Sequence, residues 1–440
     1  MSELALLGGP RAITGDHKDM FTWPIITAEH EEAVLEVLRR GGMSGIDVTG
    51  QFEQEFAAWA GTRRGLGFSS GTASLQAAMF GVGMGVGDEL IAPSLTYWAS
   101  ALQTFTLGAT VVFADVDPDT LCIDPADIEH RITDRTKAIM VVHYLGHPAD
   151  MDPIMEIARR RGIAVIEDVS HSQGGRYHGR TLGTIGDVGA MSLMSGKAFA
   201  IGEAGILITD DEKIYQRALA WGHYERFDER VDDPGIAPFR GLPLGGYKYR
   251  MHQLSSAVGR VQLRHYDEQI AEIERAMSRF WDQLDGVPGL RAIRPDASAG
   301  DRNGGWYAPH GLYVADELNG LSVTRFCEAV RAEGFGAAPG VNKPLHLHPL
   351  LNEADVYHAG KPTRIANSDR DLRQPPGSLP VSEAAGSRTY SIPWFKHYEP
   401  AVIDEYAAAY AKVSANHKEL LADDPGDPAD LGGLHFYNAG

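Results

Sequence analysis

The sequence predicts an α/β protein: a mostly parallel sheet that is sandwiched by helices, followed by a smaller C-terminal α+β domain. Short apolar runs alternate with amphipathic segments from residue 65 to residue 209, and this alternation stops after residue 250. Alternating strands and helices build a parallel sheet that is covered on both faces. A chain of 440 residues is also longer than a single core usually supports, which favours two domains.

The composition excludes several classes of protein. The chain has 40 Lys and Arg against 59 Asp and Glu, a net charge of −19, so we expect no nucleic-acid partner. Two cysteines, Cys122 and Cys327, are too few for a disulfide framework or a cysteine-rich metal site, and we expect no metal. The N-terminus does not resemble a signal peptide and no apolar stretch has the length of a membrane helix. We therefore expect a cytoplasmic protein with no membrane partner.

A large domain is predicted for residues 21–260, after an irregular N-terminal arm over residues 1–20. Thr27 opens a helical pattern with glutamates in its first turn, and Gly41 and Gly42 close it. The strands predicted next are Gly65–Phe68, Glu89–Ser94, Thr110–Ala114, Ala138–Tyr144, Ile163–Glu167, Val188–Met194 and Ile206–Thr209. Helical patterns between these strands include Ala73–Phe80 and Met151–Arg161.

The smaller domain is predicted for residues 261–422 and includes the helix that links it to the large domain. Apolar residues at helical spacing predict this helix from Ser255 to Leu284, which places the boundary near residues 260–285. Two more helical patterns cover Val323–Glu333 and Ala401–Lys418. The tail, residues 423–440, is rich in turn-forming residues and is expected on the surface.

The first candidate site joins a predicted strand to the helix that follows it. The segment Ser69-Ser70-Gly71-Thr72 leaves free main-chain N–H groups in the first helical turn, where the helix dipole favours an anion. Gly71 lets the backbone approach a ligand closely, and Thr72 adds a hydroxyl. This pattern indicates a phosphate site without lysine, although an ordinary capped turn explains the same residues.

Two further strand ends carry charged residues. Asp168 ends a strand at the carboxyl edge, where open α/β sheets bind ligands. Its carboxylate is suited to pair with a protonated heterocyclic nitrogen, and equally to cap a helix. Lys197 follows a later strand on a loop beside Gly196, and a lysine in a cleft of low dielectric loses its proton readily and can form a Schiff base. A surface lysine is the alternative interpretation.

The phosphate turn, the aspartate and the lysine follow the order of a fold-type-I pyridoxal-phosphate enzyme. The sequence resembles the DegT/StrS family of sugar and cyclitol aminotransferases from about residue 20 to residue 400. The motifs that carry the resemblance are Gly71-Thr72-Ala73-Ser74-Leu75, Gly87-Asp88-Glu89-Leu90-Ile91, Pro93-Ser94-Leu95-Thr96-Tyr97, Val142-His143-Tyr144-Leu145-Gly146, Glu167-Asp168, Ser192-Leu193 with Lys197, and Tyr249-Arg250-Met251 before Gln262-Leu263. As a set these motifs are specific, whereas each of them alone is not.

The resemblance implies pyridoxal 5'-phosphate as the cofactor and gives roles to matching positions. Lys197 matches the lysine that forms the Schiff base and later moves the proton, and Asp168 matches the partner of the pyridinium nitrogen. Tyr97 matches the aromatic residue that stacks on the ring. His171, the third catalytic candidate, lies where the family has Gln or His near the phenolic oxygen. The positions that match phosphate contacts are Gly71, Thr72 and Ser192.

The sequence departs from the family pattern at two positions. The Gly-Glu-Gly-Gly turn of the family is Gly202-Glu203-Ala204-Gly205 here, a change that the loop should tolerate. The family often has Asn before Tyr-Arg-Met, where it reaches the phosphate in the partner subunit. Lys248 takes this place and could bind a phosphate as a point charge. The resemblance thus implies a homodimer with its active site at the subunit interface.

The reaction implied by the resemblance is transamination. The acceptor is a nucleotide-linked keto sugar or a free keto cyclitol, and the donor is glutamate or glutamine. One alternative is a sugar dehydratase or other lyase of the same family, in which His replaces the Schiff-base lysine. A second alternative is a non-catalytic regulator on the same fold. The presence of Lys197 and Asp168 favours the aminotransferase.

The segment from Lys343 to Pro393 is long, contains prolines and histidines, and shows no regular pattern. Such segments are usually functional or disordered. His346 and His348 are either surface histidines or part of a substrate-binding wall. Basic residues such as Arg364 and Arg373 favour a diphosphate-containing acceptor slightly over a cyclitol, although nearby acidic residues dilute this charge.

Overall fold

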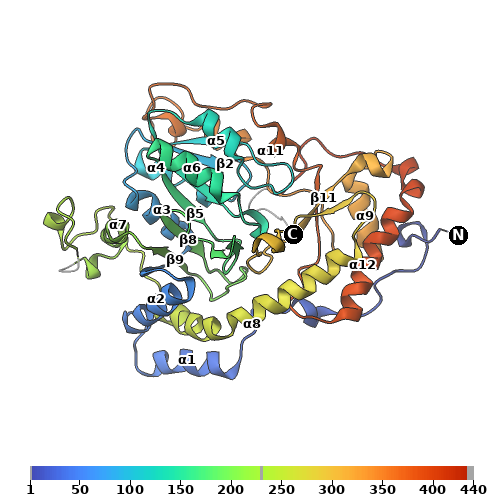
Figure 1. Cartoon of the computed structure of the whole chain (residues 1–440), viewed down its shortest axis with the longest axis horizontal. Coiled ribbons are helices and arrows are strands. Elements are labelled where there is room, and N and C mark those ends of the chain that lie inside the picture. The colour runs from blue at the N-terminus through green and yellow to red at the C-terminus, as the bar shows by residue number, and fades with distance from the viewer. Residues whose placement is uncertain (1, 228–230, 434–440) are drawn as a thin grey trace.

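A central sheet flanked by helices dominates the structure (Figure 1). The computed structural model describes residues 2–227 and 231–433, so Met1 of the predicted arm and residues 434–440 of the predicted tail lie outside the described residues. The predicted α/β architecture is confirmed: the large sheet is mostly parallel, and a smaller sheet lies in the C-terminal part of the chain.

The central sheet has seven strands. In spatial order they are β1 (Arg64–Phe68), β9 (Gly205–Thr209), β8 (Val188–Ser192), β5 (Ala164–Asp168), β4 (Thr136–Val142), β2 (Glu89–Pro93) and β3 (Thr110–Ala114). Strand β9 is antiparallel to both of its neighbours, whereas the other neighbouring pairs are parallel. All seven predicted strands are confirmed to within two residues at each end. A short hairpin of β6 (Arg176–Tyr177) and β7 (Arg180–Thr181) follows β5.

The helices around this sheet are α1 (Ala28–Arg39), α2 (Asp47–Ala60), α3 (Gly71–Gly81), α4 (Thr104–Leu107), α5 (Pro125–Arg131), α6 (Met151–Arg161) and α7 (Glu212–Gly222). Thr27 caps α1 in a capping box with His30, and Gly41 follows the helix with a left-handed φ, as its predicted ends require. Helix α2 is not among the predicted helices. Its buried Phe52 and Phe56, one turn apart, are the sequence signal that could have revealed it.

Helix α8 (Gln253–Gln283) connects the two parts of the molecule (Figure 1). Its Tyr266 and Ile270 belong to the larger of two clusters of buried apolar residues, and its Ile273 belongs to the smaller one. The elements around the smaller cluster are β10 (Leu290–Ala292), β11 (His310–Tyr313), β12 (Thr389–Ser391), α9 (Val323–Glu333) and α12 (Pro400–Ala415). The change of cluster falls in the predicted boundary region, residues 260–285, and the division of the chain into two domains there stays a prediction.

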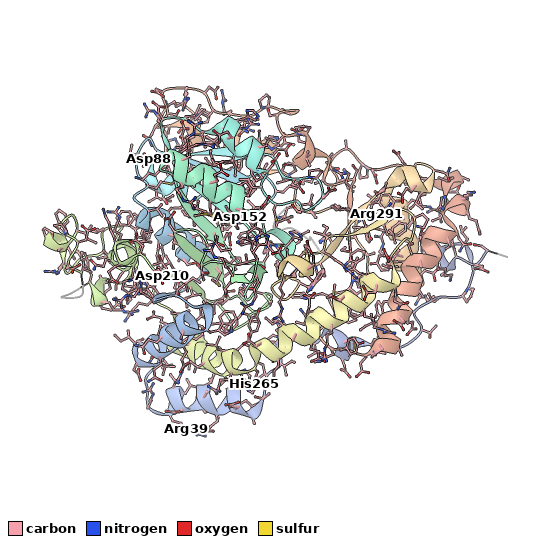
Figure 2. The ribbon with its side chains drawn as sticks, viewed as in Figure 1. Arg39, Asp88, Asp152, Asp210, His265 and Arg291 are labelled. Atoms are coloured by element: carbon pink, nitrogen blue, oxygen red, sulfur yellow. The ribbon has the colours of Figure 1, made fainter. Side chains whose placement is uncertain are left out.

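The N-terminal elements are attached to α8 and to the smaller cluster. His265 of α8, labelled in Figure 2, pairs with Glu29 of α1. The arm before α1 is largely irregular, as predicted, but its Leu4, Ile13 and Met20 are buried in the smaller cluster. The arm therefore packs on the C-terminal part of the molecule.

The segment from Lys343 to Pro393 contains more regular structure than its sequence indicates. It includes α10 (Pro349–Asn352), α11 (Pro380–Ala384) and the strand β12. Leu345, Leu351 and Leu379 are buried in the larger cluster. This part of the predicted small domain therefore packs against the larger cluster, because its apolar side chains are buried there.

Two further findings concern residues 2–227 and 231–433. None of the helices in these ranges is both long enough and apolar enough to cross a membrane. Within the same ranges, three or more His, Cys, Asp or Glu side chains do not come together in a group that could hold a metal ion. The cytoplasmic location expected from the sequence stays a prediction.

Candidate active site

A cavity of about 550 Å³ lies at the carboxyl ends of the parallel strands. Residues between 70 and 203 contribute most of its lining, including Ser70, Gly71, Thr72, Thr96, Tyr97, Asp168, Ser170, His171, Ser192, Lys197 and Glu203. The C-terminal part contributes a second wall, which consists of Tyr307, Ala308, His310, Val341, Asn342 and Gly433. The structure thus brings together all predicted cofactor-binding positions except Lys248. This clustering follows from the parallel sheet, in which successive strands end at one edge.

The predicted phosphate turn lies at the start of α3. The Ser70 hydroxyl accepts a hydrogen bond from the Ala73 N–H (3.2 Å) and so caps the helix, while Gly71 and Thr72 form its first turn. A Cβ on Gly71 would lie 2.5 Å from the Cβ of Ser192. Glycine is therefore required here because β8 passes so close, a reason that the sequence does not reveal.

Asp168 is held in a fixed orientation at the end of β5. One carboxylate oxygen accepts a hydrogen bond from the Ser100 hydroxyl (2.7 Å), and the other accepts one from the Ser170 N–H (3.0 Å). The Ser170 hydroxyl in turn accepts a hydrogen bond from the Ser192 N–H (2.9 Å). The aspartate and the Ser192 position are thereby connected through one serine.

Lys197 contributes its side-chain amine to the lining of the cavity, and 8% of its surface is exposed. Its Nζ lies 3.8 Å from the centre of the Tyr307 ring. Burial lowers the pKa of Lys197 to about 8, and the negative charge of Asp168 opposes this shift. A fraction of the lysine is consequently uncharged near neutral pH, as a nucleophilic amine must be.

His171 lies beside the lysine and is neutral. Burial, and then the nearby charge of Lys197, hold the pKa of His171 well below its usual range. The Leu145 N–H donates to Nδ1 (3.3 Å), so the proton of the neutral ring is assigned to Nε2. The imidazole packs between Tyr144 and Tyr307, with ring centres 5.6 Å and 4.6 Å away. His171 can therefore donate one hydrogen bond from Nε2.

The segment that carries Tyr307 is packed very tightly between neighbours of the catalytic candidates. A Cβ on Gly304 would lie 2.2 Å from the carbonyl carbon of Ser172, and one on Gly305 would lie 2.5 Å from the Cβ of Ala198. These are the residues that follow His171 and Lys197 in the chain. This wall is not among the predicted site residues, and the adjacent glycines before an aromatic residue are the signal that could have indicated a close approach.

The predicted substrate residues His346 and His348 do not line the cavity, which corrects that expectation. His346 is fully buried, with Nδ1 2.8 Å from the Ser94 hydroxyl and Nε2 3.0 Å from a Glu383 oxygen. It fastens the segment after Lys343 to the end of β2. His348 accepts a hydrogen bond from the Leu350 N–H and caps the short helix α10. Both histidines therefore hold the backbone in place.

The two departures from the family pattern have different outcomes. In the turn Gly202-Glu203-Ala204-Gly205, the departure is Ala204, which fits in the buried loop. The next residue, Gly205, could not be replaced, because a Cβ there would lie 2.3 Å from the Ser70 carbonyl oxygen. Lys248 is exposed and lies outside the cavity of its own chain. A contact of Lys248 with the phosphate of a partner subunit stays a prediction.

Comparison with known proteins decides the family. Residues 24–409 match the model of the DegT/DnrJ/EryC1/StrS aminotransferase family. The chain belongs to this family. Among curated proteins, GDP-perosamine synthase of Caulobacter vibrioides is 32% identical and aligns over 89% of this chain and 96% of that protein. The L-glutamine:2-deoxy-scyllo-inosose aminotransferase of Micromonospora echinospora is 35% identical, over 90% of this chain and 95% of that protein.

A solved structure of an aminotransferase shows the same fold. An aminotransferase from Psychrobacter cryohalolentis superposes with a TM-score of 0.78 at 28% identity and covers 90% of this chain and 99% of its own. The expected fold class, a mostly parallel sheet between helices with a small C-terminal sheet, is therefore confirmed. The family is one of pyridoxal-phosphate-dependent aminotransferases, so the enzyme class expected from the resemblance is confirmed as well.

Proposed function

We propose that this chain is a pyridoxal 5'-phosphate-dependent aminotransferase that converts the carbonyl of a keto sugar or keto cyclitol to an amine, with glutamine or glutamate as donor. One observation carries the proposal: a buried lysine with a lowered pKa, Lys197, faces Asp168 and the N-terminus of α3 in one cavity. The family assignment and the activities of the two curated relatives support it.

The residues of the cavity fit this cofactor. The first turn of α3 offers N–H groups to a phosphate, and Thr72 and Ser192 offer hydroxyls. Asp168 presents an oriented carboxylate for the ring nitrogen, and Tyr97 provides an aromatic face at the cavity. When bound, pyridoxal phosphate supplies an electron sink that stabilises negative charge on the substrate carbon.

Lys197 and His171 are the residues that handle protons and orientation in this proposal. Because the pKa of Lys197 is lowered to about 8, its Nζ can bind the cofactor carbonyl and later accept or return a proton. His171 stays neutral and donates a hydrogen bond from Nε2 without competing for that proton. Tyr307 covers Lys197 on the side of the second wall and excludes water from the amine.

The alternatives fit these residues less well. A dehydratase of this family would carry His at the position of Lys197, as the resemblance implies. A non-catalytic regulator has no need for a buried lysine with a lowered pKa beside an oriented Asp168. The aminotransferase is the function that uses all of these groups.

The charges of the cavity favour an uncharged acceptor. Among its described lining residues, Lys197 is the one lysine or arginine. Arg364 is fully buried and donates to the Val111 carbonyl, while Arg373 pairs with Asp371, and neither belongs to the described lining of the cavity. We therefore reverse the slight preference drawn from the sequence and propose a keto cyclitol, whose hydroxyls need no cation.

We also propose that the protein acts as a homodimer. The chain that follows α7 extends away from the central sheet (Figure 1), and Phe239 and Leu242 on it are 60% and 75% exposed. A second copy of the chain would cover these apolar side chains. Lys248 lies on the same segment, where it could reach the partner's phosphate site.

The proposal is tested with the purified holoenzyme. Addition of L-glutamine or L-glutamate should remove the visible absorption of the cofactor. Addition of 2-deoxy-scyllo-inosose should then restore it and yield an amino product detected by mass spectrometry. A GDP-linked 4-keto sugar serves as the second acceptor. An enzyme that reacts with neither donor would refute the proposal, and one that aminates the GDP-linked sugar alone would refute the cyclitol preference.

A further inference from the structure

The last described residues of the chain run back over the body of the protein. We refer to residues 424–433 as the C-terminal tail. The Asp424 carboxylate accepts a hydrogen bond from the Ser322 N–H (2.7 Å), and the Asp427 carboxylate accepts one from the Thr324 N–H (2.9 Å). These bonds attach the start of the tail to the N-terminus of α9. The tail lies beyond residue 409, where the match to the family model ends.

The other end of the tail reaches the active-site cavity. The Gly433 N–H donates to the Val341 carbonyl (3.0 Å), and the Lys343 N–H donates to the Gly433 carbonyl (3.2 Å). Asn342 and Gly433 thereby form a parallel β-bridge. Val341, Asn342 and Gly433 all belong to the second wall of the cavity. The tail thus both supports this wall and forms part of it.

The body of the protein is shaped to accept the tail. A Cβ on Gly386 would lie 2.6 Å from the Leu431 carbonyl oxygen, and one on Gly340 would lie 2.9 Å from the Cα of Gly432. Real Cβ atoms do not approach other atoms this closely, so a larger residue at either position would displace the tail. Glycine at both positions indicates that the tail has a defined place.

The tail is also connected to the cofactor side of the cavity. The Asn342 N–H donates to the Tyr144 hydroxyl (3.4 Å), and the Tyr144 ring packs beside His171. The second wall itself carries uncharged polar side chains, including those of Asn342 and His310. Burial lowers the pKa of His310, so this imidazole is neutral. Such groups suit the hydroxyls of a polyhydroxy ketone, whereas the carboxylates of an amino-acid donor call for a cation.

We infer that the C-terminal tail is a specificity-determining part of the active site, which holds residues 341–343 in the wall that binds the keto acceptor. This inference rests on the proposed function, because it names the element that determines which keto acceptor is bound. Transamination has two half-reactions, one with the amino donor and one with the keto acceptor. We expect the tail to affect the reaction with the acceptor and not the reaction with the donor.

Two variants test the inference in the holoenzyme. Gly386→Ala places a methyl group against the tail from a position outside the cavity. Gly336→Ala is its matched control, because a Cβ on Gly336 meets open space. A chain shortened to residues 1–427 keeps the anchors Asp424 and Asp427 and lacks the end of the tail. For Gly386→Ala and the shortened chain we expect the acceptor KM to rise about tenfold, the effect of one misplaced pocket contact. In Gly386→Ala, whose substitution lies outside the cavity lining, the rate of reaction with L-glutamine should stay unchanged.

The readouts distinguish this inference from the proposed function. The acceptor KM is measured with 2-deoxy-scyllo-inosose and with a GDP-linked 4-keto sugar. Hydrogen exchange at the Lys343 amide, which is independent of turnover, should become faster in both variants and not in Gly336→Ala. An unchanged acceptor KM, unchanged exchange, or an equal loss in both half-reactions would overturn the inference. Failure of the unaltered enzyme to react with any donor would refute the proposed function instead.

Discussion

Lys197 and Lys396 are both almost completely buried, with 8% and 4% of their surface exposed, but their surroundings differ. Lys197 faces a cavity and the carboxylate of Asp168. Lys396 lies against the faces of Trp23 and Trp394, and within the described part of the chain its Nζ has no hydrogen-bond partner. Burial lowers the pKa of Lys197 to about 8 and that of Lys396 to about 5.

This difference shows that burial lowers the pKa of a lysine but does not by itself make the amine reactive. Desolvation lowers the pKa of both amines, because a charged group is costly away from water. At Lys197 the nearby Asp168 limits the shift, so the amine can gain and lose a proton near neutral pH. At Lys396 burial is the one cause of the shift, and Lys396 is not among the described residues that line the active-site cavity. A reactive lysine thus needs a counter-charge and a cavity in addition to burial.

The largest effect is expected from removing the reactive amine. Lys197→Met should abolish turnover and the visible absorption of the bound cofactor, since no other described residue of the cavity lining carries a side-chain amine. Absorption spectra and assays with L-glutamine measure both properties. Lys396→Met is the matched control and should retain the absorption band and at least about half of the turnover, within the usual range for a residue away from the reacting atoms. Equal losses in the two variants would break the comparison.

The second effect concerns the counter-charge. Asp168→Asn keeps the shape of the side chain but removes its negative charge. We expect kcat to fall by about 10²–10³-fold, as for the loss of one preorganised electrostatic partner. The Ser100→Ala variant, which deletes one hydrogen bond to Asp168, should have a much smaller effect. Turnover of Asp168→Asn close to that of the unaltered enzyme would contradict the role of this carboxylate.

The third effect concerns the ring that covers Lys197. Tyr307→Leu removes the aromatic face 3.8 Å from Nζ and should lower kcat about tenfold, because a misplaced catalytic group loses its orientation. Tyr307→Phe keeps the ring and should retain most of the activity. Steady-state kinetics of the two variants distinguish the ring face from the hydroxyl. A Phe variant as impaired as the Leu variant would show that the hydroxyl is the essential group.

The smallest effect is on stability. Lys396 is uncharged in the folded protein above about pH 5, whereas in the unfolded chain it stays protonated up to about pH 10.5. The unfolded state therefore binds an extra proton between these values, so stability rises with pH across this window. Lys396→Met should raise the free energy of unfolding at pH 7 by more than about 1 kcal/mol, the equivalent of one pKa unit. Urea unfolding at pH 6, 8 and 10 should show this gain shrinking as the pH rises; a constant difference would contradict it.

The sequence was sufficient to predict the central sheet and several of the residues that gather at its carboxyl edge. Strands such as β3 and β4 are continuous apolar runs because both faces are covered, and this pattern is visible without a structure. The positions of Gly71, Asp168 and Lys197 at strand ends follow from the parallel sheet. Helix α2 escaped prediction because its first turn, Asp47–Gly50, consists of residues with weak helix preference.

The second wall could not be predicted, because it depends on contacts between distant segments. Tyr307 and Asn342 lie on irregular segments without a periodic pattern, and packing alone brings them to the cavity. His346 was misplaced for a related reason. From sequence alone, a histidine on a long irregular segment is easily interpreted as a substrate-binding residue. The structural role of His346 becomes visible only with its partners Ser94 and Glu383, which are far away in the sequence.

The tight packing at Gly304 and Gly305 has a consequence for redesign of the acceptor pocket. On that side a single methyl group would collide with the residues next to His171 and Lys197. Libraries that enlarge or reshape the pocket there would therefore lose folded protein before they gain new substrates. The side formed by residues 341–343 is the better place for such changes, because it is bonded to a terminal segment that lies outside the central sheet.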